Sequence, residues 1–143
     1  VSRWTLMRDF MATTSESYSA VAFLDIKDNM CEDDPFLPME ASWSDLHVFE
    51  KAPGALRSDD AVSKCYGAAG TKALQGKAPL CVGAAIGGWD AALVFATKMV
   101  RHLEKPDCTV EDVHEYIVRT GELGGAVSPS RVQTHTHAEG WVG

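Results

Sequence analysis

The segment 79–100, PLCVGAAIGGWDAALVFATKMV, constrains the fold of this chain more than any other. It is almost uniformly apolar, it contains three glycines, and its one acidic residue is Asp90. A segment of this kind can form a phosphate-binding loop, a membrane span or a packed helix. The positions of its glycines and charges distinguish these three structures.

The first interpretation is a dinucleotide-binding loop. Residues 83–88, GAAIGG, loosely match the pattern Gly-x-Gly-x-x-Gly, with alanine in place of the second glycine. A helix beginning at Trp89 would offer its N-terminal amides to a phosphate. The pattern also requires an acidic residue after a following strand, about twenty residues later. That region, 102–106, reads HLEKP, which is typical of the end of a helix, so the sequence disfavours a nucleotide-binding protein.

The second interpretation is a membrane span. The segment 79–100 is long enough to cross a bilayer, and its glycines would suit helix contacts there. Asp90 near its middle would cost about 2.5–3.5 kcal/mol on insertion. The neighbouring apolar residues would recover about half of that cost. A membrane contact through 79–100 is therefore not favoured.

The third interpretation is a packed amphipathic helix from Trp89 to Lys105. Asp90 lies in its first turn and Arg101 in its last, where the helix dipole favours each charge. Pro106 ends the helix. The side expected to be buried consists of Ala92, Leu93, Ala96, Met99, Val100 and Leu103.

Capping signals predict further helices. Ser58, followed by two aspartates, begins a helix that stops at Gly76. Thr109 begins another, because Asp112 three residues later resembles the second half of a capping box. The spacing of apolar residues adds a short helix over 4–11.

These signals predict a mainly α fold of three or four helices. A single compact domain is expected over 1–123, and it includes an irregular acidic segment, 27–57. Residues 124–143 have no hydrophobic period and little apolar surface, so we expect an extended C-terminal tail. The alternative is an α+β fold in which Ser19–Ile26 and Leu46–Phe49 are strands.

The net charge of −7 is concentrated in one region. Residues 25–60 contain ten acidic and three basic residues, so this window alone carries the whole net charge. Such a field repels nucleic acid and can steer a basic protein partner. We therefore expect other protein subunits as partners, and no nucleic acid.

Two pairs of residues have metal-ligand spacing. Glu111 and His114 form an ExxH pattern, which directs a carboxylate and an imidazole from one helix toward one metal ion. His135 and His137 would project from the same face of an extended segment and could bind zinc or copper. Neither pair completes a site by itself.

The four cysteines, Cys31, Cys65, Cys81 and Cys108, lie far apart and form no Cys-x-x-Cys pair. A chain of this length does not need disulfides to fold. We expect free, partly buried thiols and no four-cysteine zinc site.

The sequence contains no catalytic constellation, and no cofactor is expected. It favours a non-catalytic accessory or structural subunit of a larger assembly, which docks through the acidic segment and the C-terminal tail. Trp43, Phe49 and Trp141 would be the anchoring residues, because aromatic side chains dominate interface energies. The alternative is a small metal-binding protein or enzyme that uses Glu111 and His114.

Overall fold

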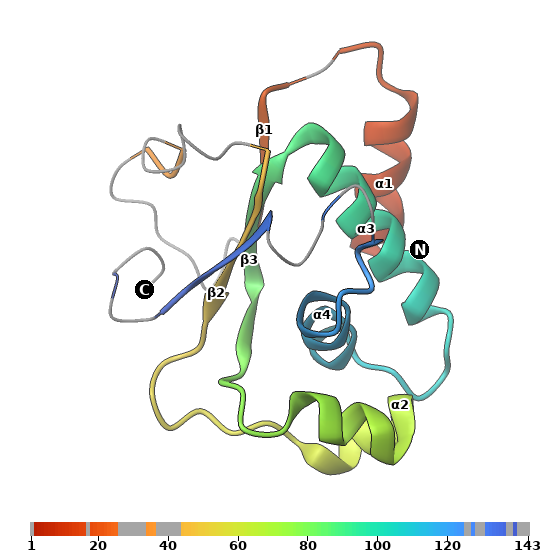
Figure 1. Ribbon diagram of the computed structural model, residues 1–143. Helices are drawn as coiled ribbons and strands as arrows, with labels where there is room; N and C mark the ends of the chain where they lie inside the picture. Colours follow the sequence, from red (N-terminus) through yellow and green to blue (C-terminus); the bar gives the residue numbers. More distant parts are fainter. Residues whose placement is uncertain are drawn as a thin grey trace.

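The computed structural model describes residues 2–16, 18–25, 34–36, 44–124, 127, 131–136 and 139. Over these residues the protein has an α+β fold with four helices and a mixed four-stranded sheet (Figure 1). The prediction of a mainly α fold is therefore wrong. The alternative placed strands at 19–26 and 46–49, and the structure has strands in both segments.

The four helices begin and end close to the predicted positions. The Ser58 side chain accepts a hydrogen bond from the Ala61 amide, and Thr109 and Asp112 form both halves of a capping box. The predicted buried side of the third helix is largely confirmed, with Ala92, Ala96 and Met99 inaccessible. The helices are α1 (Arg3–Thr13), α2 (Asp59–Leu74), α3 (Trp89–Leu103) and α4 (Val110–Arg119).

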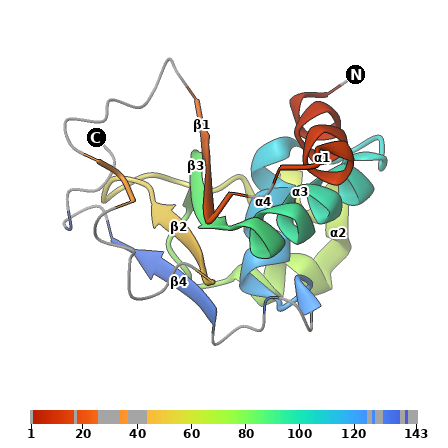
Figure 2. The same cartoon turned by 90° about the horizontal axis from the view of Figure 1, so that it is seen from above.

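The sheet has the strand order β1-β3-β2-β4. Strand β3 pairs antiparallel with β1 and β2, and β4 pairs parallel with β2. All four helices lie on one face of the sheet, which Figure 2 shows from above. The strands are β1 (Ala20–Leu24), β2 (Leu46–Glu50), β3 (Leu80–Gly88) and β4 (Val132–His135).

Strand β3 accounts for the error in fold class. Most of its nine residues are small or apolar, and alanine and glycine are poor strand formers. Both of its faces are covered, so it shows no alternation of polar and apolar residues. Glycine is needed at one point: a Cβ at Gly87 would lie 3.2 Å from the carbonyl oxygen of Asp45, the residue before β2.

The main core lies between the helices and the sheet. The Trp4 ring of α1 packs against Phe23 of β1 and Phe95 of α3, with ring centroids 5.4 and 5.3 Å away. Val127, which follows α4, is completely buried in the same core. Part of the segment 124–143 thus contributes to the core of the domain.

Cys65 and Cys108 form a disulfide, so the prediction of free thiols is wrong for this pair. Their Cα atoms are 4.8 Å apart, and the bond ties α2 to the loop before α4. Beside it the rings of Tyr66 and Tyr116 stack with their centroids 3.7 Å apart. Cys81 is a free cysteine, and Cys31 lies outside the described residues.

A buried ion pair joins α2, α4 and β3. The Arg57 guanidinium donates to both carboxylate oxygens of Glu115, each at 2.6 Å, and their side chains are only 10% and 7% exposed. Arg57 also donates to the Leu74 carbonyl at the end of α2 and to the carbonyl of Lys77. Glu115 in turn accepts from the amide of Leu80, the first residue of β3.

We predict that Glu115→Ala lowers the free energy of unfolding by about 3–5 kcal/mol, because it leaves a buried guanidinium and a buried amide without a partner. Urea denaturation measures this change. Lys64→Ala, which removes an exposed ion pair with Asp60, is the matched control and should cause no measurable loss. An equal loss in both variants would mean that the Glu115 pair has no special structural role.

Removal of the disulfide through Cys65→Ala/Cys108→Ala should also destabilise the fold. The bridge closes a loop with a sequence separation of 43, and the loop-entropy relation assigns about 4 kcal/mol to a loop of that length. Urea denaturation of the wild type with and without a dithiol reductant should give a similar difference. Cys81→Ala, which leaves the bridge intact, is the control.

Candidate functional site

The face of the sheet opposite the helices carries a second, smaller apolar cluster. Phe49, Ala84 and Ile86 are at most 3% exposed and form its centre. Phe36, from the acidic segment, packs against this cluster. The residues from the acidic segment that the structure describes thus cover part of this face and contribute strand β2.

His47 and His135 meet on this second face. In the parallel register of β2 and β4, His47 lies opposite Gln133, and Phe49 lies opposite His135. Since side chains alternate along a strand, these four residues project to the same side. His47 Nδ1 lies 2.9 Å from His135 Nε2, and the two rings are nearly parallel with an interplanar angle of 13°.

Glu139 extends the pair into a chain of three polar groups. Its Oε2 lies 2.9 Å from His135 Nδ1, on the opposite side of the imidazole from His47. The His135 hydrogen bond, followed by that from the Thr136 amide, holds the pKa of Glu139 below its usual value. The ionised carboxylate is an acceptor only, so His135 Nδ1 carries a proton.

The contact with Glu139 limits the tautomers that the His135 ring can adopt. In the neutral form of the His135 ring, a proton on Nδ1 leaves a lone pair on Nε2, which accepts a hydrogen bond from His47 Nδ1–H. The aromatic ring of Phe49 also stacks on His135, with centroids 5.3 Å apart. The three polar groups are therefore held in one orientation by both hydrogen bonds and packing.

Exposure to solvent increases from His47 through His135 to Glu139. His47 is 3% exposed, the His135 side chain is 14% exposed, and the Glu139 side chain is 44% exposed. The contact between His47 and His135 therefore lies at the buried end of this group, and Glu139 lies at its exposed end.

The structure places the two members of the other predicted metal pair in different environments. Glu111 is exposed on α4, whereas His114 is 1% exposed and lies in the core against Phe95. Neither ring nitrogen of His114 has a hydrogen-bond partner among the described residues. Across the described ranges, no group of three or more His, Cys, Asp or Glu side chains has the geometry of a metal site.

The predicted interface residues are only partly visible. Phe49 is 3% exposed and packs within its own sheet. Trp43, Trp141 and the metal candidate His137 lie outside the described residues. Their proposed roles stay predictions.

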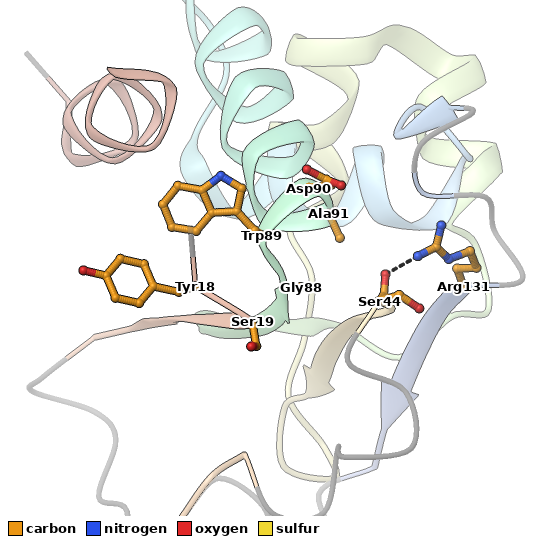
Figure 3. A pocket seen from close by; sticks show the side chains of 8 residues that line it. All are labelled: Tyr18, Ser19, Ser44, Gly88, Trp89, Asp90, Ala91 and Arg131. Carbon is orange, nitrogen blue, oxygen red and sulfur yellow. Dashed lines mark hydrogen bonds between the residues drawn. The ribbon is translucent and has the colours of Figure 1, made fainter. Parts of the chain in front are cut away.

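A pocket of about 290 Å³ lies where β3 ends and α3 begins, at the glycines of the segment 79–100 (Figure 3). Tyr18 and Trp89 line one side, and Arg131 lines the other. Arg131 donates to the Ser44 carbonyl and pairs with Asp45. Asp90 also lines the pocket, so the pocket carries both an acidic and a basic side chain. It therefore favours no particular class of ligand.

Sequence reasoning identified His135 as a candidate but missed its pairing with His47. The available signal was the strand LHVFE, in which one histidine stands among apolar residues. A buried polar side chain requires a partner, so such a histidine indicates a second polar group on the same face. Which group this is depends on the pairing of β2 with β4. Paired residues such as His47 and Gln133 lie 86 positions apart in the sequence, and no local pattern predicts that pairing.

Comparison of the chain with protein-family profiles, with curated proteins and with solved structures finds no significant match. Among the described residues, none of the helices is both long and apolar enough to cross a membrane. The segment 79–100 is divided between β3 and α3. The function must therefore be argued from the geometry of the chain itself.

His114 predicts a pH dependence of stability. Burial, followed by the positive charges of Arg119, Arg3 and Lys51, lowers its pKa from 6.5 to about 3. Between these two pKa values the unfolded chain binds a proton at this position and the folded chain does not. This difference in proton binding does not affect stability above pH 6.5. Below pH 6.5 it favours the unfolded chain, so the free energy of unfolding decreases as the pH falls toward 3.

We predict that His114→Phe lessens the loss of stability between pH 7 and pH 4 by about 2–3 kcal/mol relative to the wild type. Urea denaturation at both pH values measures the difference, and His114→Leu checks that it does not depend on ring size. Parallel pH profiles for the wild type and both variants would show that His114 titrates normally in the folded protein.

Proposed function

We propose that this protein is a small metal-binding protein whose ligands include His47 and His135. The single observation that carries the proposal is the 2.9 Å approach of His47 Nδ1 to His135 Nε2. In the metal-free protein one proton lies between these nitrogens. A metal ion in its place would use the lone pairs of both.

The distance between the rings is close to what a metal requires. Zinc–nitrogen bonds of 2.0–2.1 Å at a tetrahedral angle place two ligand nitrogens about 3.3 Å apart. The two nitrogens must therefore separate by about 0.4 Å, and the rings, which now face each other in line, must also turn toward a common ion. The proton on His47 Nδ1 moves to its other ring nitrogen when the metal binds, which leaves the ring neutral. Imidazole ligands suit zinc, copper, nickel and iron, with Cu²⁺ expected to bind most tightly among the divalent ions.

Glu139 supports the same proposal. A metal-ligating histidine typically donates its other N–H to a carboxylate, which fixes the ring and increases its basicity. The Glu139–His135 contact at 2.9 Å has this arrangement. The Glu139 carboxylate lies across the His135 ring from the proposed ion, so it would act on the ion through the imidazole.

The proposal replaces the ligands expected from sequence. Glu111 and His114 were expected to bind the metal, but one is exposed and the other is enclosed by the core. Assembly through the acidic segment and the C-terminal tail, the other function expected from sequence, stays a prediction. The structure weakens the argument for a docking tail, because two parts of the tail pack within the domain itself: β4 pairs with β2, and Val127 lies in the main core.

The test is isothermal titration of the metal-free protein with Zn²⁺, Ni²⁺ and Cu²⁺ at pH 7. We expect one site per chain, with loss of binding in His135→Ala and in His47→Phe. Glu139→Gln should weaken binding about 10–100-fold, as other supporting carboxylates do.

His102→Gln is the matched control, because it also removes a histidine. His102 lies near the end of α3 and contacts Tyr66, so it belongs to neither β2 nor β4. Circular dichroism must show that each variant folds. Equal affinity in the wild type and in His135→Ala would contradict the proposal, and the paired histidines would then be a structural contact between β2 and β4.

A further inference from the structure

Helix α2 is sharply bent at Gly67. A straight helix of its 16 residues would be about 24 Å long. Arg57, two residues before its start, nevertheless donates a hydrogen bond to the carbonyl of Leu74, its last residue, at 2.7 Å. Gly67 has φ 68° and ψ −173°, a combination that is essentially confined to glycine. The chain therefore turns at Gly67, and the two ends of α2 come near each other.

Residues 63–69 surround this bend, and we call them the apex of α2. They lie between the buried residues Val62 and Gly70, and each of them is exposed or only partly buried. The disulfide joins the apex, at Cys65, to Cys108 in the loop before α4. The covalent link to the rest of the domain thus lies next to the point at which α2 can bend.

Tyr66, the residue after Cys65, makes further contacts of the apex. Its ring stacks on Tyr116 of α4, and its hydroxyl lies 2.8 Å from Nδ1 of His102 in α3. The Lys105 ammonium lies 4.6 Å from the centroid of the same ring. Tyr66 is only partly buried, so water competes for these contacts when the covalent link is absent.

The two sulfurs are also accessible to a reductant, because Cys65 and Cys108 are only partly buried. A thiolate of a dithiol attacks one sulfur of the bridge, forms a mixed disulfide with that cysteine and displaces the other cysteine as a thiolate. The second thiol of the dithiol then attacks the mixed disulfide and releases the first cysteine. Two electrons and two protons pass to the protein, which becomes a pair of thiols, and the dithiol leaves as a disulfide.

We propose that the disulfide between Cys65 and Cys108 is a redox switch for the bend of α2. In the oxidised protein the bridge fixes the apex against the loop before α4. In the reduced protein the apex moves about Gly67, while the ion pair of Arg57 with Glu115 keeps the ends of α2 in place. Helix α2 lies at the border of the helical layer beside α4, so this motion leaves the sheet folded (Figure 1). The switch does not involve the proposed metal site.

The test is amide hydrogen exchange by mass spectrometry on the full chain, with and without excess dithiothreitol. Alkylation of thiols and peptide mapping establish the redox state of Cys65 and Cys108. Residues 63–70 should exchange at least tenfold faster after reduction, at a rate that low urea concentrations do not change, as expected for a local opening. Strand β3 and helix α3 should exchange more slowly than 63–70, and urea should accelerate them, because they require unfolding of the whole domain.

Two variants serve as references. Cys65→Ser/Cys108→Ser should show the fast exchange at 63–70 with or without dithiothreitol. Cys81→Ala keeps the bridge and should respond to dithiothreitol as the wild type does.

Four outcomes would overturn the switch. The bridge could resist excess dithiothreitol in the folded protein, or exchange at 63–70 could be the same in both redox states. Loss of the far-UV circular dichroism signal on reduction would show that the bond holds the whole fold and not the apex alone. The same conclusion would follow if 63–70, β3 and α3 all exchanged through one opening that urea accelerates.

Discussion

The buried ion pair between Arg57 and Glu115 is the interaction on which the arrangement of the fold depends. Arg57 holds carbonyl groups at the end of α2, and Glu115 of α4 holds the amide at which β3 begins. Strand β3 is the centre of the sheet, so its starting point determines where β1 and β2 pair. A pair with so little exposure is sensitive to the loss of either partner, because the other charge is left buried.

The proposed site depends on the sheet in a simple way. Strand β2 pairs antiparallel with β3 on one side and parallel with β4 on the other, and this second pairing brings His135 beside His47. Glu139, four residues after His135, then orients the imidazole from the opposite side. The geometry combines a buried ligand from an interior strand with a partly exposed ligand from the edge strand of the sheet.

The helices could be predicted from the sequence because their signals are local. A serine before two aspartates, a threonine three residues before an aspartate, and the charges at the two ends of α3 act within one or two helical turns. The strands could not be assigned with the same certainty. Strand β3 consists largely of alanine, glycine and apolar residues, and it forms because neighbours on both sides supply its hydrogen bonds.

The sequence by itself determined the four helices, their boundaries and the candidate ligand His135. It also determined the acidic segment, whose charge is a matter of composition alone. Only the tertiary structure decided that 80–88 is an interior strand, that Cys65 and Cys108 meet, that His114 is enclosed, and that His47 is the partner of His135. The physical reason is distance along the chain: caps and dipoles act between neighbours, whereas sheet pairing joins segments that no local pattern relates.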